Sequence, residues 1–454
     1  MGAAYDVRGD GKTAIKVTLN KYVAGQALGG LPFAAVPINR TAFTSSRNWN
    51  DNFFPVGDPR RDNFVVDCDL NNRLANGECT NNGAAASAAQ IAIDPNCATL
   101  GAFNCTVPVP LIDQEIRSGW NTRGYNWEFS LGVQREIIPR VSAEVTYFRR
   151  WFGNFTTTDN TAVAASEFDT FNAVAPLDSR LPGGGGYLIE GFVDPKTAAI
   201  AQRIPVNQVV LTDSIGATQI DHWNGVDVSI NARLQNGLLV QGGTSTGRRY
   251  TNSCEVSARL PERLGALPLS FCETTEPFLT QFKAVAAYTL PRYAALPATL
   301  ARTLNNVQVA ATFQSIPGVS KAATYQMTNA EFQTPALSNL GRAISNSNNG
   351  KSIALIHQGA SLYDDRHNQL DLRIGKVLRY GRTRTSLNFD LFNVTNADTV
   401  LSRNTRLSKV TGGAAPSAGA ANQAIQADGL AHSLWAPTSI LQARFFKLSA
   451  TFDF

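Results

Sequence analysis

The sequence predicts an all-β protein, an antiparallel transmembrane β-barrel, and three observations support this fold class. Segments of about ten residues with alternating apolar and polar side chains recur along the 454-residue chain, and this length suits a membrane-crossing strand. The segments come in pairs joined by tight turns, and short and long connections alternate strictly. Only 17% of the residues are charged, and no run of about 18 apolar residues predicts a transmembrane helix.

The last stretch of the chain shows the alternation most clearly. Its apolar face carries Phe446, Leu448, Ala450, Phe452 and Phe454, and its polar face carries Lys447, Ser449, Thr451 and Asp453. Successive side chains of a strand point to opposite faces, so this segment predicts a strand with one apolar and one wet face. An edge strand of a soluble β-sandwich would look the same. The recurrence of the pattern decides between the two folds.

Five pairs of alternating segments precede the last strand. They span residues 1–7 with 13–23, 125–137 with 141–152, 224–234 with 238–250, 278–290 with 305–315, and 368–380 with 383–396. The turn Gly9-Asp10-Gly11-Lys12 joins the first pair, and Asp-Gly between alternating runs is a strong hairpin signal. About eleven membrane-length strands result, so residues 1–454 are interpreted as one partial barrel.

The long connections predict which side of the membrane each end of the barrel faces. They cover residues 25–122, which contain cysteines, and 156–218, 251–277, 318–365 and 396–438. In bacterial outer-membrane barrels, short turns are periplasmic and long loops are extracellular. With a periplasmic carboxy-terminus, every tight turn falls on the periplasmic side without conflict. Such barrels have even strand numbers, so an odd count indicates either missing strands or one strand overlooked in the sequence.

The solvent on each side explains the alternation. Lipid cannot satisfy backbone amides, so a spanning sheet must close on itself. The apolar faces then meet lipid and the polar faces meet an aqueous lumen. Aromatic residues suited to an interfacial girdle are Trp127, Tyr147, Trp151, Tyr288 and Phe389. In a soluble fold the same aromatic side chains would pack in a core.

A series of motifs occurs in a characteristic order along the chain. They are AYDVRGDGKTAIK (4–16), DCDLNNRLANGEC (67–79), GWNTRGYNWEFSLGVQRE (119–136), APLDSRLPGGGGY (175–187), GVDVSINARLQNGLLVQGGTSTGR (225–248), SLNFDLFNVTN (386–396) and the terminal ATFDF. In this order they resemble the carboxy-terminal barrel of TonB-dependent receptors, of the Oar-like kind that carries a carboxypeptidase-regulatory-like domain. The resemblance implies a plugged barrel of about 22 strands. This chain resembles its second half, without the plug and the other amino-terminal domains.

The family resemblance also implies a function and a set of partners. It implies an outer-membrane receptor and transporter that binds an extracellular ligand of unknown identity at its long loops and imports it. The expected partners are outer-membrane lipid, the TonB complex through the missing amino-terminal part, and the barrel-insertion machinery. The aromatic strand at 446–454 resembles the signal that this machinery reads. The expected location is the cell outer membrane of a Gram-negative-type bacterium.

Two other functions use the same barrel. A surface-display or adhesive protein would use the barrel only to present its loops, without transport. An open porin would pass small solutes, but the long loops and the resemblance argue against it. A plug and a TonB-contacting segment upstream would favour transport, whereas an adhesive module upstream would favour display.

The six cysteines all lie in loop-like segments, which fits an oxidising compartment and local disulfides. Cys254 and Cys272 lie in one long connection, with no other cysteine nearby to pair with. Cys97 and Cys105 form a second candidate pair, and Cys68 and Cys79 a third; the connectivity stays open. The amino terminus shows no secretory signal, so an exported protein of this kind is expected to lack its front part.

The segment between Cys68 and Cys79 carries a candidate calcium site. Asp67, Asp69 and Asn71 place oxygen ligands at every second residue, and Glu78 falls at the twelfth position, as in a calcium-binding loop. Asn72 stands at the sixth position, where such loops have glycine, and no helices are predicted to flank the segment. The alternative is a disulfide-closed polar loop whose Asp and Asn side chains only make turns.

The sequence predicts no enzyme and no cofactor other than this calcium. The four histidines are His222, His357, His367 and His432, and none lies in a HExxH or nucleophile-elbow context. The glycine-rich stretch 182–187 lacks the Lys-Ser/Thr of a phosphate-binding loop. The net charge of +5 is scattered rather than gathered into a basic stripe, so no nucleic-acid partner is expected.

Overall fold

A computed structural model of the chain describes most of its 454 residues. The described residues are 1–25, 49–70, 76–79, 111–203, 205–235, 237–291, 297, 299, 303–345, 350–407 and 434–453. Within them, no helix has the length and apolar character needed to cross a membrane.

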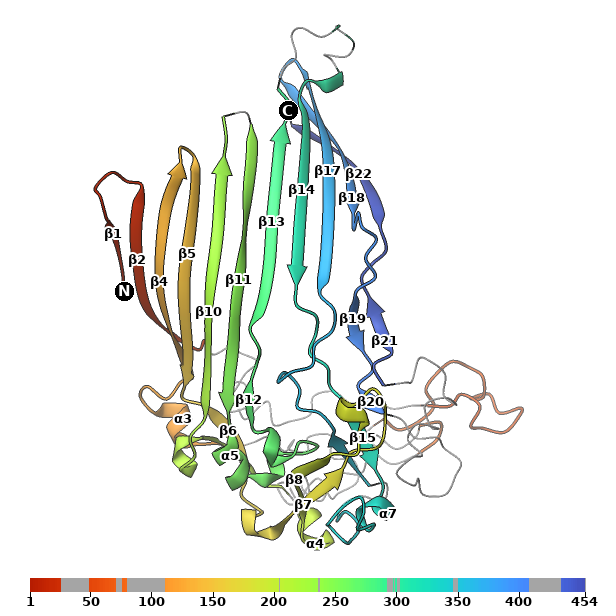
Figure 1. Ribbon diagram of the computed structural model, residues 1–454. Helices are drawn as coiled ribbons and strands as arrows, with labels where there is room; N and C mark the ends of the chain where they lie inside the picture. The colour runs from red at the N-terminus through yellow and green to blue at the C-terminus, as the bar shows by residue number, and fades with distance from the viewer. Residues whose placement is uncertain are drawn as a thin grey trace.

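Eleven strands form one continuous antiparallel sheet in the order β1-β2-β4-β5-β10-β11-β13-β14-β17-β18-β22 (Figure 1). Their bounds are β1 Gly2–Asp6, β2 Thr13–Val23, β4 Tyr125–Ile138, β5 Val141–Gly153, β10 Ile220–Arg233, β11 Leu238–Asn252, β13 Leu279–Thr289, β14 Val307–Ile316, β17 His367–Tyr380, β18 Thr383–Phe392 and β22 Phe445–Asp453. A short further strand, β12 (Glu273–Thr275), pairs with β11. The predicted all-β class and the eleven predicted strands are confirmed.

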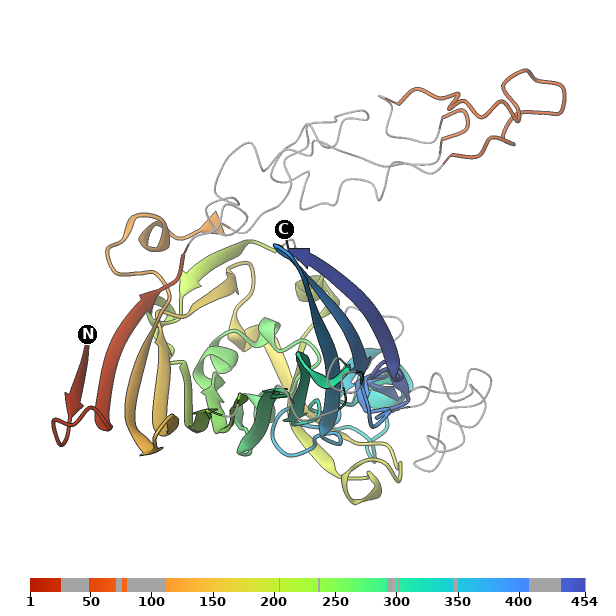
Figure 2. The same ribbon diagram turned by 90° about the horizontal axis from the view of Figure 1, so that it is seen from above.

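The sheet curves from β1 to β22 like part of a barrel wall (Figure 2). β1 and β22 stand at the two ends of the strand order, so the predicted barrel is not closed in this structure. The edge of an open sheet presents a row of backbone N–H and C=O groups without strand partners. A closed wall around this curve therefore requires further strands or a partner at both edges.

Short and long connections leave opposite ends of the sheet, as predicted (Figure 1). The tight turns contain residues in the left-handed conformation, such as Arg140 (φ 70°) between β4 and β5 and Gly381 (φ 56°) between β17 and β18. Two-residue hairpin turns need positive φ because their twist must match that of the strands. Which end faces the cell exterior stays a prediction.

The burial pattern of the sheet is inside out compared with that of a soluble protein. On β4, Ser130 is 8% exposed while its neighbour Leu131 is 44% exposed, and on β5 Thr146 is 9% exposed while Val145 is 49% exposed. Directly opposed residues share a face, so the apolar residues form rows across the strands. One row contains Val17, Leu131, Tyr147, Val226, Thr246 and Thr280. We call the two sides the apolar face and the polar face.

The apolar face takes part in no hydrophobic core. Among the described residues there are three buried hydrophobic clusters, and none of them contains a residue of the eleven strands. In a β-sandwich the apolar sides of two sheets would bury each other. The soluble-sandwich alternative is therefore wrong for this part of the chain.

The long connections fold together into a second unit, which we call the loop cap. It comprises the described parts of 154–219, 253–278, 317–366 and 393–444. Its strands are β6 Thr156–Asn160, β7 Phe168–Val174, β8 Leu188–Pro195, β9 Asn207–Leu211, β15 Thr324–Met327, β16 Lys351–Ala354, β19 Val400–Arg403, β20 Arg406–Leu407 and β21 Pro437–Ile440. They make the sheets β16-β15-β20, β7-β8 and β19-β21, while β6 and β9 form a sheet with β3 (Leu111–Ile112) of the first long connection.

Short helices complete these connections. The α-helices are α3 Gln114–Ser118 in the first long connection and, in the cap, α4 Ala198–Ala201, α5 Cys254–Arg259 and α7 Asn329–Phe332. The 3-10 helices are η3 Ala165–Glu167, η4 Pro182–Gly184, η5 Asp213–Ile215, η6 Pro261–Arg263 and η7 Leu269–Phe271. Phe171, Phe192 and Phe332 lie at most 1% exposed at the centre of the cap core. This core joins residues from connections that are far apart in the sequence.

Candidate ligand-binding face and loop cap

The polar face of the sheet is lined with charged side chains that pair across strands. Lys16 Nζ lies 3.3 Å from Glu144 Oε1, and Arg249 Nη2 lies 2.5 Å from Asp221 Oδ2. Arg150 pairs with Glu128, and Arg373 pairs with Asp390. The four cations are 39–55% exposed, whereas Asp221 and Asp390 are at most 10% exposed. The pairs therefore orient the side chains and compensate the charge of these two carboxylates.

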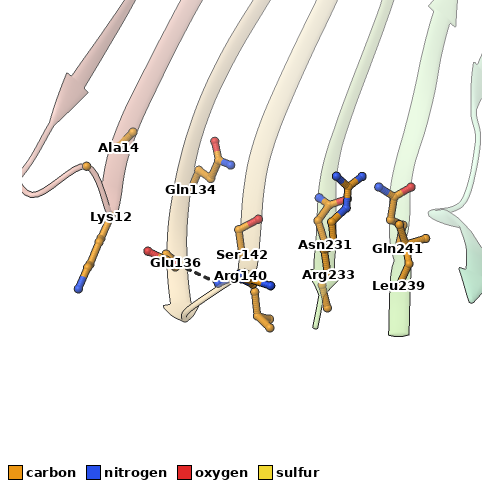
Figure 3. A pocket seen from close by; sticks show the side chains of 13 residues that line it. Lys12, Ala14, Gln134, Glu136, Arg140, Ser142, Asn231, Arg233, Leu239 and Gln241 are labelled. Atoms are coloured by element: carbon orange, nitrogen blue, oxygen red, sulfur yellow. Dashed lines mark hydrogen bonds between the residues drawn. The ribbon is translucent and has the colours of Figure 1, made fainter. Parts of the chain in front are cut away.

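A groove of about 560 Å³ lies on the polar face near the short turns (Figure 3). Glu136, Ser142, Asn231 and Gln241 lie opposite one another in register and form its floor. The backbone N–H of Arg140 donates to Glu136 Oε1 at 3.0 Å, which ties the turn to this floor. The groove therefore offers amide, hydroxyl and carboxylate groups to a polar solute.

A second groove of about 600 Å³ lies over β10, β11, β13, β14 and β17. At one wall Gln314 Nε2 donates to Gln369 Oε1 at 3.1 Å, and Gln369 Nε2 donates to Asp371 Oδ1 at 3.0 Å. Asp227 also lines this groove, and its Oδ1 atom is buried without a hydrogen-bond partner. Buried polar atoms are normally satisfied, so Asp227 is a candidate acceptor for a ligand donor or for water.

A third pocket, of about 510 Å³, combines aromatic rings with paired charges on the polar face. It is lined by Glu128, Phe148, Arg150, Phe152, Trp223, Asp227 and Arg249. Gly225 and Gly247 lie opposite each other below the Trp223 indole, and a Cβ atom on either would come within 2.2 Å of the ring. The two glycines therefore make room for a flat aromatic ring on a polar wall. Planar or sugar-like ligands stack on such rings.

Gly225→Ala is expected to destabilise the protein by about 1–3 kcal/mol, because its methyl group would overlap the Trp223 ring and force it to move. Thermal melting measures the effect. Gly25→Ala is the matched control, since nothing lies within 4 Å of a Cβ atom at Gly25. The penalty should shrink in a Trp223→Ala background. Equal melting temperatures for Gly225→Ala and the parent protein would contradict this packing.

Ion pairs between distant connections hold the loop cap together. Arg342 donates to Asp169 Oδ2 at 2.8 Å and to Asp194 Oδ2 at 2.6 Å. Asp364 is paired with both Lys321 and Arg403, at 3.3 and 2.6 Å. The carboxylates of Asp194 and Asp364 are only 2% exposed. Losing one partner of such a pair leaves a buried charge uncompensated.

Burial shifts the pKa of several cap residues. Desolvation raises the pKa of Tyr187 to about 12, and the Tyr187 hydroxyl donates to the Leu355 carbonyl at 2.8 Å. Desolvation lowers the pKa of the Lys351 ammonium, which donates to the Val193 carbonyl. Burial also raises the pKa of Glu262, and the nearby Asp159 raises it further. These shifts reflect the dense packing of the cap.

Two of the three predicted cysteine pairs are disulfides in the structure. Cys254 is bonded to Cys272, and Cys68 is bonded to Cys79. The first closes the connection between β11 and β13, where Ser253 N donates to the Cys272 carbonyl at 3.0 Å. Cys97 and Cys105 lie outside the described residues.

The predicted calcium ligands are only partly described. Glu78 is 2% exposed; its Oε2 accepts from Asp67 N at 3.0 Å, and its Oε1 is buried without a hydrogen-bond partner. Asp67 Oδ2 accepts from Asn63 Nδ2 at 2.7 Å, and Asn71 lies outside the described residues. Within the described chain, no three His, Cys, Asp or Glu residues are placed to hold a metal ion. Calcium binding here stays a prediction.

The other predicted residues fall where the alternation indicates. Phe446, Leu448, Ala450 and Phe452 lie on the apolar face of β22, and Phe454 lies outside the described residues. The predicted girdle residues Trp127, Tyr147, Trp151, Tyr288 and Phe389 also lie on the apolar face. His357 contacts Thr274 Oγ1 at 2.7 Å and stacks on Phe271, and His432 is not described.

Sequence reasoning missed the Trp223 pocket, although one signal was available. Trp223, Gly225 and Gly247 stand at positions where the alternation predicts polar side chains. One of them is unusually large and the other two have no side chain. A glycine opposite a glycine, next to a tryptophan, indicates a ring lying across the strands. Sequence reasoning also missed the cap core, which brings together residues from several connections.

Comparisons with known proteins give a structural likeness but no match in sequence. No family model and no curated protein matches the sequence. The solved structure of P. aeruginosa FpvA bound to a heterologous pyoverdine, an FpvA–pyoverdine–iron complex, is similar with a TM-score of 0.39 and 9% sequence identity. The match covers 99% of this chain and 32% of the FpvA chain, so this chain spans about a third of that protein's length.

Proposed function

We propose that this chain forms part of the barrel wall of an outer-membrane receptor that binds a ligand and imports it. The single observation that carries the proposal is the continuous, exposed apolar face across eleven strands. The opposite, polar face of the same sheet carries charged side chains that pair with one another. Water would strongly disfavour such a surface, whereas hydrocarbon on one side and water on the other stabilise it.

The grooves and the loop cap support a receptor rather than a bare pore. Three grooves on the polar face expose amides, carboxylates and aromatic rings, and a packed cap lies at the end from which the long connections leave. The motifs in their order support a receptor of the TonB-dependent, Oar-like kind. In this proposal the cap and the Trp223 pocket hold the ligand, and a TonB complex energises its passage.

Epitope insertion tests the placement of the chain in the outer membrane. A tag after Gly183, in the connection between β7 and β8, should be labelled by antibody on intact cells. A tag after Gly381, in the turn between β17 and β18, should be labelled only after the outer membrane is permeabilised. Neither glycine has any atom within 4 Å of a Cβ position, so both sites have room. Equal labelling of both tags, or the reverse order, would refute the proposed orientation.

A further inference from the structure

Two strands of the sheet each contain two consecutive arginines, whose side chains lie on opposite faces. Arg149 and Arg150 lie on β5, and Arg248 and Arg249 lie on β11. Arg150 and Arg249 point to the polar face and pair with Glu128 and Asp221. Arg149 and Arg248 therefore project from the apolar face, because neighbouring side chains on a strand alternate.

Arg149 and Arg248 lie in one row, with Asn224 of β10 between them. Arg149 is opposite Asn224, and Asn224 is opposite Arg248. Strands lie about 4.8 Å apart, so the two arginines are separated by about 10 Å at the backbone. Asn224 Oδ1 accepts hydrogen bonds from Arg149 Nη1 at 3.1 Å and from Tyr147 Oη at 3.2 Å. The first of these bonds holds the Arg149 guanidinium next to Asn224.

Lys21 extends this positive surface toward the sheet edge. It lies opposite Trp127, which lies opposite Trp151, and its ammonium is 4.2 Å from the centre of the Tyr125 ring. Arg248 lies 4.9 Å from the centre of the Phe278 ring. Lys21, Arg149 and Arg248 are exposed, and within the described part of the chain none of them forms an ion pair with a carboxylate. We call these three residues and Asn224 the outer basic patch.

The patch borders the uncharged part of the apolar face. From Asn224 toward the short turns, β10 shows only Val226, Val228, Ile230 and Ala232 on this face. That run spans about 20 Å, close to the height of a lipid-facing apolar band. A groove of about 560 Å³, lined by Phe129, Arg149, Trp151 and His222 among others, opens at the same level. The cations therefore lie at the level of lipid headgroups, on the side of the long connections.

We propose that the outer basic patch binds the phosphorylated headgroup of a membrane lipid in the leaflet on that side. This inference rests on the proposed membrane placement. Arginine presents a fork of donors that matches phosphate oxygens, and lysine adds a compact charge. The aromatic rings beside the cations suit the boundary between headgroup and hydrocarbon. Two arginines in one row can each bind one phosphate, so the patch suits a lipid that carries two phosphates.

Lipid titration of the full chain, folded in neutral maltoside detergent, tests the proposal. Diphosphorylated lipid A is the probe, its dephosphorylated form is the reference, and native mass spectrometry counts the bound lipid. The parent protein should bind the diphosphorylated lipid at least about tenfold more tightly than the reference. Arg149→Gln/Arg248→Gln should lose that preference, and Arg149→Lys/Arg248→Lys should recover part of it.

The matched control removes the same charge from the short-turn end of the sheet. Arg135→Gln/Arg382→Gln should keep the phosphate preference, because both side chains are exposed and lie away from the outer basic patch. An unboiled gel shift shows whether each variant is folded. Inorganic phosphate at about 10 mM should not compete, because it carries one phosphate and has no acyl chains to bind the apolar face. Equal binding of both lipids, an unchanged Arg149→Gln/Arg248→Gln variant, or competition by inorganic phosphate would overturn the proposal. A folded protein that shows no phosphate preference would refute this inference alone, whereas equal or reversed labelling of the tags after Gly183 and Gly381 would refute the proposed function.

Discussion

Val228→Arg is expected to cost about 2–4 kcal/mol of folding free energy in a bilayer, the cost of an arginine at the middle of a lipid-facing strand. Val228 is 37% exposed on the apolar face, where it lies between Val145 and Thr244. The folded fraction after refolding into phosphatidylcholine vesicles, followed by gel mobility across a urea series, measures this cost. A guanidinium in hydrocarbon must be hydrated or reach the interface, and the centre of the band allows neither without deforming the bilayer.

Ser229→Arg is the control one residue further along β10. Ser229 lies on the polar face opposite Glu144, so a new guanidinium there meets water and a carboxylate. It should change the folding free energy by less than about 1 kcal/mol. If the two variants fold equally well, the assignment of the apolar face to lipid is wrong.

Phe192→Ala is expected to destabilise the loop cap by about 3–5 kcal/mol, because it opens a cavity in the cap core. Phe192 is 0% exposed, and its ring stacks on Phe171 with 5.6 Å between centroids. Hydrogen exchange of backbone amides in β7 and β8 reports the local stability of the cap. These amides should exchange at least a hundredfold faster, while amides of β10 and β11 keep their protection.

Leu188→Ala is the matched control for the cap, since Leu188 also lies on β8 and is 56% exposed. Its removal should leave the exchange rates within about threefold of the parent protein, because exposed apolar side chains add little. Slow exchange in Phe192→Ala would show that the cap does not depend on this core. Faster exchange in the main sheet as well would show that cap and sheet unfold as one unit.

The eleven strands were predictable from the sequence because one pattern of alternating apolar and polar residues suits them all. A strand between lipid and water needs only alternate residues of the right polarity, so the pattern is visible locally, as in Phe446 to Asp453 of β22. Tight turns were predictable for a similar reason, since Gly11 and Gly381 take positive φ values that few other residues adopt easily. The disulfide between Cys254 and Cys272 followed from their isolation in one connection.

The loop cap was not predictable in the same way. Its strands are short, as in β15 (Thr324–Met327) and β20 (Arg406–Leu407), and they pair across about eighty residues of sequence. Four residues carry too little periodicity to indicate a strand. Asp194 and Arg342 likewise lie in different connections, and only folding brings their charges within 2.6 Å.

By itself, the sequence determined the number of strands in the main sheet, their pairing into hairpins and the face of that sheet on which each side chain lies. Each of these depends on neighbours within about ten residues, where the period of two is decisive. Only the tertiary structure decided how the long connections pack into a cap, where the Trp223 ring lies, and that Arg149 and Arg248 share a row with Asn224. Those features depend on the register between strands and on contacts between distant segments, which residue type and spacing do not encode locally.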